Sequence, residues 1–473
     1  MKQFRYISFA IIALGLFQSC DKEFLEPAPQ TAISIDSYFA DDEQIETAVL
    51  GIYDAMQGIN STSPNDNRGI QQEFYVTEMR SDNTRTKNQE GEAAQFESFT
   101  ITPNNGIVSN YYSSTYNTIF RANLVLDNLA NASDGASAIF EGEAKFARAY
   151  SYFNLVRLFG DVPLVDRVIG PLEKETSFVR VASETIYELI VSDLQTAIAN
   201  LGSADYTKAS KGAAQALLAK VYLTLGNYTA AQGLCEDLLG QYALETNFND
   251  VFYNEGNGEI IFAIGFNAGL ESDSQDFSAE FMNGVGRTVG VNYVTLDAAT
   301  FLDANGGNRT LGSYRIDPFQ PTQRQVVKYL PNGEDGGADG KTFASDATLS
   351  GNDWIVLRYA DVLLMHVEAI LAGGETTSDL AALNSFQEVR NRAGLTTAVS
   401  SISKQDLLNE RRAELAFENQ RFFDLVRFGV AQEVLSAHAT ATANTFSGTD
   451  LLLPIPQREI NLSQGLMSQN PGY

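Results

Sequence analysis

Apolar residues recur at steps of three and four between Ser210 and Leu239, the period of an amphipathic helix. Gly226 and Asn227 interrupt the pattern: glycine accepts the left-handed turn that ends a helix, and asparagine caps the helix that follows. The pattern therefore predicts two antiparallel helices with one apolar seam, which another helical pair has to cover. The residues around the turn are spaced as in a tetratricopeptide repeat. The apolar positions are Ala213, Ala214, Leu217, Leu218, Val221, Tyr222 and Leu225, then Ala231, Leu234, Cys235, Leu238 and Leu239.

The same period predicts further helices along the chain, at 45–56, 112–126, 146–159, 186–201, 357–371, 383–393 and 403–415. A β-branched apolar run, Glu259–Phe266, predicts a strand. Two long segments, Gly58–Thr102 and Ala268–Ser350, show no sustained helical period. Segments of that length are usually functional or loosely ordered. We therefore expect a mainly α fold, with tetratricopeptide-like helical pairs as scaffold, two long loop-rich insertions and minor β structure.

The N-terminus carries an export signal. Lys2 and Arg5 precede the apolar run Tyr6–Phe17, which is too short to span a bilayer. The run closes on Cys20, an order typical of a bacterial lipoprotein signal, in which the cysteine is lipidated and becomes the first mature residue. The alternative is an ordinary secretory signal with an incidental cysteine. We divide the chain into a signal peptide (1–19), a lipid-anchored tether (20–40), an N-terminal region with the repeat-like helices (41–240) and a C-terminal region (241–473).

Composition and charge exclude several classes of protein. Apolar residues make up 44% of the 473, which is typical of a globular chain and not of a disordered one. Lys and Arg number 32 against 59 Asp and Glu; removal of Lys2 and Arg5 leaves 30 − 59 = −29. This charge disfavours nucleic acid as a partner. The second cysteine, Cys235, lies on an apolar stripe, so we expect it in the core and expect no disulfide framework.

Catalytic and metal-binding patterns are weak. His366 and His438 are the only histidines, neither has a Cys or His at zinc spacing, and no G-x-S-x-G motif occurs. The acidic residues are too numerous for counting to exclude a pair of glycosidase carboxylates. We expect no enzyme and no cofactor. The only metal that the sequence suggests is a structural calcium ion, because the spacing of Asp335, Asp339 and Asp346 partly matches that of a calcium-binding loop. The alternative, which we favour, is a flexible acidic turn.

Nine segments in chain order resemble one family, the SusD/RagB-like surface lipoproteins of Bacteroidetes-type bacteria. The resemblance implies an α-helical fold without catalytic activity. It also implies a lipid-anchored protein on the outer membrane, facing the exterior, that binds an oligosaccharide and delivers it, as a lid, to a partner SusC-like TonB-dependent transporter. The segments are Cys20 with DKEFLEPAPQTAIS; MRSDN (79–83); FARAYSYFNLVRLFGDVPL (146–164); Ser210–Leu239; EIIFAIGF (259–266); RYADVLLMHVEAI (358–370); VRNRAGL (389–395); ERRAELAFENQRFFDLVRFG (410–429); and LPIPQREINLSQGLMSQNPGY (453–473).

Two other functions stay open: the same architecture binding peptides, and a tetratricopeptide-like adaptor without a small ligand. Trp354 is the only tryptophan, and its place beside a strongly helical segment favours a packing role. A glycan platform would therefore depend on Tyr and Phe, which leaves room for peptides. We expect the charged residues of 410–429 to form local ion pairs within the fold, not to bind ligand. For the same reason we expect Tyr150, Phe153 and Phe159 in the core.

Sugar recognition combines aromatic faces with amide, carboxylate and guanidinium groups, and both insertions supply that mixture. The first offers Phe74, Tyr75, Arg80, Asp82, Asn83, Arg85, Asn88 and Phe96; the second offers Phe281, Arg287, Asn292, Tyr293 and Tyr314. Of these, we predict that Tyr75, Arg80, Asp82, Asn83, Phe96, Asn292 and Tyr293 contact the ligand. The sequence leaves the identity of that ligand open.

Overall fold

The computed structural model describes residues 38–58, 68–86, 91–170, 172–268, 273–282, 292–330 and 349–473. It is mainly helical, and its strands form two-stranded sheets. One large hydrophobic core cluster draws residues from both halves of the chain. Among the described residues, no helix combines the length and the apolar character needed to cross a bilayer. The predicted signal peptide and Cys20 lie outside the described residues and stay predictions.

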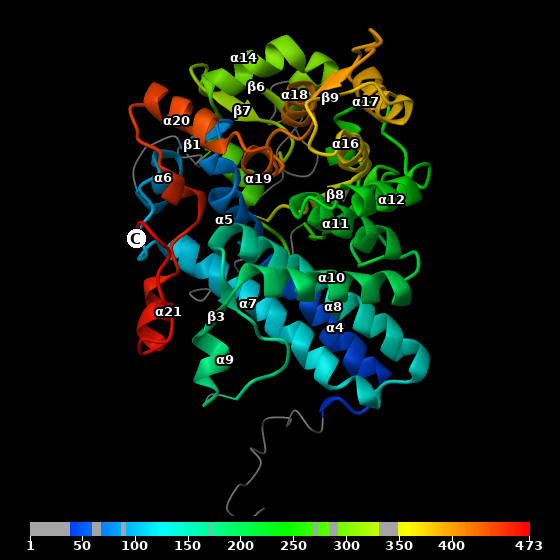
Figure 1. The fold of residues 1–473 in the computed structure, drawn as a ribbon, viewed down its shortest axis with the longest axis vertical. Helices are drawn as coiled ribbons and strands as arrows, with labels where there is room; N and C mark the ends of the chain where they lie inside the picture. The colour runs from blue at the N-terminus through cyan, green and yellow to red at the C-terminus, as the bar shows by residue number, and fades with distance from the viewer. Residues whose placement is uncertain are drawn as a thin grey trace, which may run out of the picture.

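Eight helices form the scaffold, each packed against a neighbour in the array. Figure 1 shows the array rising from α4, α7, α8 and α10 in the lower half of the molecule to α17 at the upper right. This succession confirms the helical scaffold that the periodicity predicts. The helices are α4 (Asp42–Gln57), α7 (Gly106–Asp127), α8 (Asp134–Phe159), α10 (Ser183–Asn200), α11 (Lys211–Thr224), α12 (Tyr228–Leu238), α16 (Tyr359–Leu371) and α17 (Leu380–Arg392).

The pair α11–α12 has the ends that the sequence indicates. The Ser210 side chain accepts a hydrogen bond from the Ala213 amide at the start of α11 (3.1 Å). Gly226 has a φ of +72°, which an L side chain rarely adopts, and Asn227 caps α12. The residues predicted as core, Cys235, Tyr150, Phe153 and Phe159, are buried.

The first insertion contains more regular structure than its period indicates. Its helices are one to two turns long, too short for an apolar stripe to be visible in sequence, and burial of Ile70, Phe74 and Val76 stabilises the first of them. The elements are α5 (Gly69–Val76), η1 (Glu78–Arg80), β1 (Thr84–Thr86) and α6 (Gly91–Ser98).

The second insertion is also partly ordered. Its longest helix starts at a Thr295 side chain that accepts a hydrogen bond from the Ala298 amide (3.1 Å). Figure 1 places this helix and the two strands that follow it at the top of the molecule. The elements are η3 (Phe277–Phe281), β5 (Asn292–Val294), α14 (Leu296–Asn305), η4 (Gly307–Arg309), α15 (Thr310–Ser313), β6 (Tyr314–Ile316) and β7 (Arg324–Val326).

The start of one helix, α16, is predicted too early in the sequence. The period predicts a helix from Leu357, whereas residues Trp354–Arg358 form strand β8, which pairs antiparallel with β4 (Ile260–Ile264). β4 is the strand that the sequence predicts. Trp354 is buried, with its ring 4.9 Å from Tyr329 and 5.4 Å from Phe277, which confirms its packing role.

The chain closes with four helices, of which α18 has the capping box of Ser403 and Asp406 that the sequence predicts. They are α18 (Lys404–Glu414), α19 (Arg421–Arg427), α20 (Ala431–Ala441) and α21 (Gln457–Leu462). The remaining short elements are η2 (Leu129–Asn131), β2 (Val162–Pro163), α9 (Lys174–Phe178), β3 (Arg180–Val181), α13 (Asp250–Tyr253), β9 (Thr376–Thr377), β10 (Ile402–Ser403) and η6 (Gly448–Leu451).

Candidate functional site

The two insertions meet in a two-stranded sheet. β1 of the first pairs antiparallel with β5 of the second, and Arg85 stands opposite Tyr293 in the register. Thr295 fastens the junction: its amide donates to the Asn83 carbonyl (3.0 Å) and its hydroxyl to the Asp82 carbonyl (2.9 Å). Groups more than 200 positions apart in the chain are thereby held side by side.

We call the outward side chains of this junction the insertion platform: Arg85 on β1, Tyr293 on β5 and Arg324 on the neighbouring strand β7. All three are partly exposed. The Arg85 guanidinium lies over the Tyr293 ring, 4.9 Å from its centroid. Burial raises the pKa of the Tyr293 phenol; the positive charges of Arg85 and Arg324 oppose that shift, and the negative charge of Glu97 adds to it. A tyrosine ring can stack on a sugar, and guanidinium groups beside it can donate hydrogen bonds to the sugar's substituents.

Glu97 on α6 supports the platform from within. Its carboxylate accepts hydrogen bonds from the Thr86 amide and from the Thr86 hydroxyl (2.9 Å). Burial raises the pKa of Glu97, and these two hydrogen bonds oppose the rise. The carboxylate therefore ties β1 to α6 and fixes the strand that carries Arg85.

Five of the predicted ligand contacts are buried, so their side chains are not presented to a ligand. Arg80 is fully buried; it donates to the Asp450 carbonyl (2.5 Å) and lies 4.1 Å over the Phe422 ring. Tyr75 and Phe96 stack on each other at 6.3 Å inside the core.

Asp82 and Asn83 bind other parts of the chain. Arg421 donates two hydrogen bonds to the Asp82 carboxylate (2.8 and 2.9 Å), and Arg412 pairs with it at 3.0 Å. The Asn83 amide donates to Glu78 (2.9 Å). The side chains of Asp82 and Asn83, which the sequence assigns to ligand recognition, thus form ion pairs and hydrogen bonds within the protein. Their partners belong to α18, α19 and η1.

The other predicted residues divide into two groups. Tyr293 belongs to the insertion platform, and the backbone of Asn292 lies beside it in β5. Asn88, Arg287, Asp335, Asp339 and Asp346 lie outside the described residues. Within the described part of the chain, no three His, Cys, Asp or Glu residues are arranged to hold a metal ion.

A second candidate region is a cleft of about 620 Å³, which no sequence motif indicates. Tyr206 donates to Asp353 (2.7 Å), and Gln57 donates to Asp273 (2.6 Å). Burial raises the pKa of Asp353, and the nearby carboxylates of Asp205 and Asp273 raise it further. Its walls come from several separate segments, so only the fold assembles it. The lining residues include Tyr53, Asp54, Gln57, Tyr206, Lys208, Glu255, Phe266, Asp273 and Asp353.

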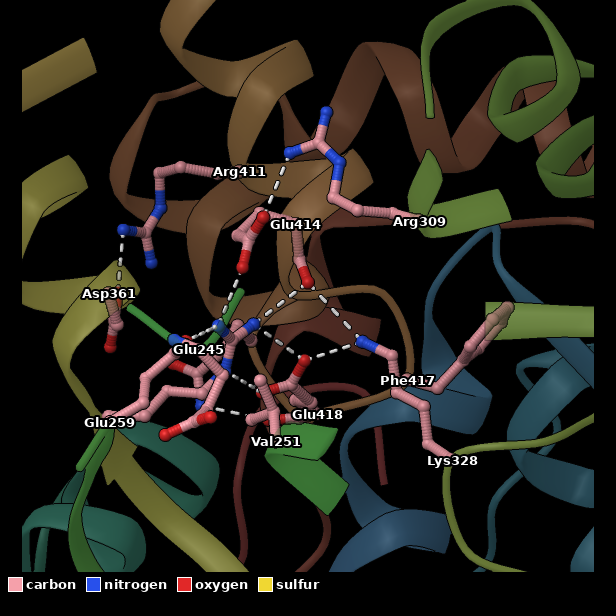
Figure 2. A network of polar contacts seen from close by, with 12 residues as sticks. Glu245, Val251, Glu259, Arg309, Lys328, Asp361, Arg411, Glu414, Phe417 and Glu418 are labelled. Atoms are coloured by element: carbon pink, nitrogen blue, oxygen red, sulfur yellow. Dashed lines mark hydrogen bonds and ion pairs between the residues drawn. The ribbon is translucent and has the colours of Figure 1, made fainter. Parts of the chain in front are cut away.

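A buried ion network lies behind these surfaces (Figure 2). Arg358 pairs with Glu259 (2.8 Å), Glu414 (2.6 Å) and Glu418 (2.7 Å). Lys328 pairs with Glu418 (2.5 Å), although burial lowers its pKa to about 8. The expectation that the charges of 410–429 serve the structure is confirmed. Arg427 and Asp424 form a local helical pair (2.8 Å), as the spacing predicts, but most of the other partners are distant in sequence and buried.

We expect Glu78 to make the free energy of unfolding depend on pH. It is fully buried; one carboxylate oxygen accepts from Asn83 (2.9 Å) and from the Phe417 amide (3.2 Å), and the other has no partner among the described residues. Burial raises its pKa to about 7 from an ordinary 4.5. The contribution of protonated Glu78 to the free energy of unfolding is therefore full below pH 4.5 and is lost as pH rises through 7. The cause is that Glu78 ionises at a lower pH in the unfolded chain than in the folded protein. The loss amounts to about 3 kcal/mol.

Replacing Glu78 with glutamine should remove that loss, because an amide does not ionise. Urea unfolding between pH 4.5 and pH 8 measures it: the free energy of unfolding of Glu78→Gln should rise relative to that of the parent by about 3 kcal/mol across the interval. Glu433→Gln, a change at an exposed carboxylate, is the control and should follow the parent. Parallel curves for Glu78→Gln and the parent would contradict the assignment.

Comparison with known proteins finds two family models. The model described as "SusD family" matches residues 337–473, and the one described as "Starch-binding associating with outer membrane" matches residues 23–223. Both fall on segments that carry the resemblance in the sequence, and together they cover the scaffold helices at the two ends of the array.

Relatives and a solved structure agree with these matches. The chain is 27% identical to SusD-like protein P2 of Formosa agariphila, with 100% of both chains covered. It is 25% identical to the starch-binding protein SusD of Bacteroides thetaiotaomicron, over 75% of this chain and 76% of that one. A structure described as a laminarin-binding SusD-like protein superposes with a TM-score of 0.74 at 27% identity, covering 91% of this chain and 99% of the other.

Proposed function

Because the chain belongs to the SusD-like family, we propose that it captures an oligosaccharide at the insertion platform and performs no chemistry on it. The observation that supports this most is the pairing of β1 with β5. It joins the two insertions and presents an aromatic ring beside guanidinium groups at the molecular surface. Sugar rings bind to such surfaces because their C–H faces pack on the aromatic ring while their hydroxyls accept hydrogen bonds.

The relatives favour a glycan over other ligands. One solved relative is described as binding laminarin, and a curated relative as binding starch. Both match this chain over most of their length, the first in structure and the second in sequence. Because the platform lacks tryptophan, the sugar contact here would fall on Tyr293.

Delivery to a transporter is the second part of the proposal. Lipidation at Cys20 would anchor the protein to the outer membrane, in keeping with the description of the family model that matches residues 23–223. From there the helical scaffold would act as a lid on a SusC-like TonB-dependent transporter, and the captured glycan would pass inward. The protein would face the cell exterior, where the glycan is met.

Tyr293→Ala tests the site. We expect the dissociation constant for a bound oligosaccharide to rise about 10-fold, equivalent to about 1.4 kcal/mol, because the stacking face is lost. Isothermal titration calorimetry measures it. The matched control is Tyr222→Ala, which removes a partly exposed tyrosine from scaffold helix α11 and should leave affinity unchanged.

Three outcomes would count against the proposal. Unchanged affinity in Tyr293→Ala, with a loss in Tyr206→Ala, would move the ligand to the acidic cleft. Binding of peptides in place of glycans would favour the peptide-binding alternative. A tetratricopeptide-like adaptor would bind neither, and would tolerate changes to both insertions.

A further inference from the structure

The insertion platform carries two arginines that differ from most of the buried or partly buried arginines that the structure describes. Most guanidinium groups elsewhere pair with carboxylates, although Arg80, Arg157 and Arg180 donate to carbonyl or amide oxygens instead. Among the described residues, neither Arg85 nor Arg324 forms an ion pair. The Arg85 Nε atom is buried and has no hydrogen-bond partner there. Paired examples elsewhere are Arg148–Asp193, Arg309–Glu410, Arg358–Glu418, Arg392–Glu259, Arg411–Asp361 and Arg427–Glu368.

The carboxylates nearest the platform are already engaged. Glu97 accepts two hydrogen bonds from Thr86. Asp297 pairs with Arg412 (2.7 Å), which also pairs with Asp82. Asp303 accepts the Tyr314 hydroxyl (2.7 Å). Among the described residues, no carboxylate therefore forms an ion pair with Arg85 or Arg324, although the Glu97 charge acts on Arg85 and on the Tyr293 ring.

Two like charges near one another repel, and an anion placed between them relieves the repulsion. Guanidinium groups suit this task because their planar donors match the oxygens of carboxylate or sulfate in pairs. The acidic cleft offers the opposite potential, since it is lined by Asp54, Glu255, Asp273 and Asp353 and by a single lysine. An anionic ligand would be repelled there and attracted to the platform.

We infer that the platform selects an anionic oligosaccharide, one whose sugars carry carboxylate or sulfate groups. This inference rests on the proposed function and narrows its ligand class. Arg85 and Arg324 bind the anionic substituent, and Tyr293 packs against the sugar ring. Both charged groups are specificity determinants, while the ring serves neutral and anionic sugars alike.

Calorimetric titration with three oligosaccharides of matched length tests the inference: a neutral laminari-oligosaccharide, an oligogalacturonate and a sulfated carrageenan oligosaccharide. We expect at least one anionic ligand to bind about 10-fold more tightly than the neutral one, and its affinity to fall as NaCl is raised from 50 to 500 mM. The better of the two anionic ligands identifies carboxylate or sulfate as the substituent.

Variants of the two arginines distinguish the effect of losing their charge from an effect on folding. Arg85→Gln and Arg324→Gln should each weaken the anionic ligand about 10-fold and leave a neutral one unaffected. The matched control is Arg458→Gln, which removes an exposed arginine on α21, a helix that lies well below β7 in Figure 1. Melting temperatures equal to that of the parent show that the variants are folded.

The results that overturn the inference differ from those that overturn the proposed function. Neutral ligand bound as tightly as anionic ligand, or anionic binding that both variants leave unchanged, would refute the anionic preference while glycan capture stands. Absence of heat with all three oligosaccharides, together with binding of an acidic peptide, would refute both.

Discussion

Replacing Arg358 with methionine is expected to lower the free energy of unfolding by about 3–5 kcal/mol, because it removes a cation that three buried carboxylates share and leaves them with fewer positive charges nearby. Arg358 is 2% exposed and pairs with Glu259, Glu414 and Glu418. Burial alone would lower its pKa, but these carboxylates raise it well above its usual range. The guanidinium therefore stays charged, and methionine fills its volume without its charge.

Urea unfolding of Arg358→Met measures the loss. The control is Arg167→Met, which breaks an exposed pair with Glu173 and should leave the unfolding midpoint unchanged, since water screens that pair. Comparable unfolding midpoints for the two variants would show that the network contributes little. The result bears on the fold, because β8, α18 and the residues after it meet at Arg358.

The second large effect is expected from Asp82→Asn, with a loss of about 3–5 kcal/mol. Burial alone would raise the pKa of Asp82, but Arg421 and Arg412 overcome it and hold the pKa far below its usual range. A lowered pKa gives stability that is present above pH 4 and is lost as pH falls. The variant removes this contribution and leaves the buried Arg421 guanidinium without its carboxylate, while Arg412 keeps its pair with Asp297.

Asp82 is also the residue for which a structural role and a ligand contact predict different results. A structural role predicts a lower urea midpoint, with glycan affinity restored at low temperature where the variant is folded. A ligand contact predicts normal stability with weakened binding. Asp297→Asn is the matched control, because that carboxylate pairs with the same Arg412 but is largely exposed, and its effect on stability should be small.

The helical scaffold could be predicted from the sequence because the patterns that specify its helices involve residues close together in the chain. The stripe that predicts α11, the Asn227 cap of α12 and the capping box at Ser403 each depend on residues within a few turns. β8 could not be predicted in this way. Its apolar residues continue the period of α16, and only the pairing with β4, about 90 residues earlier, distinguishes strand from helix.

The sequence predicts the region of the candidate site better than it predicts the individual residues of that site. The sequence identifies both insertions and Tyr293 as part of a recognition surface, and the pairing of Arg85 with Tyr293 places the two insertions together. The MRSDN segment looks like a polar recognition loop because its partners, Arg412 and Arg421, lie about 330 residues away. Polarity in sequence does not distinguish a buried ion pair from an exposed ligand contact. The acidic cleft was missed for a related reason, since it exists only after several segments meet.

The measurement that tests the account most directly is calorimetric titration of the protein beginning after Cys20 against a panel of oligosaccharides and tryptic peptides. We predict saturable heat with one glycan class, abolished or weakened by Tyr293→Ala, and none with peptides. Saturable heat from peptides with silence from every glycan would contradict oligosaccharide capture at the insertion platform.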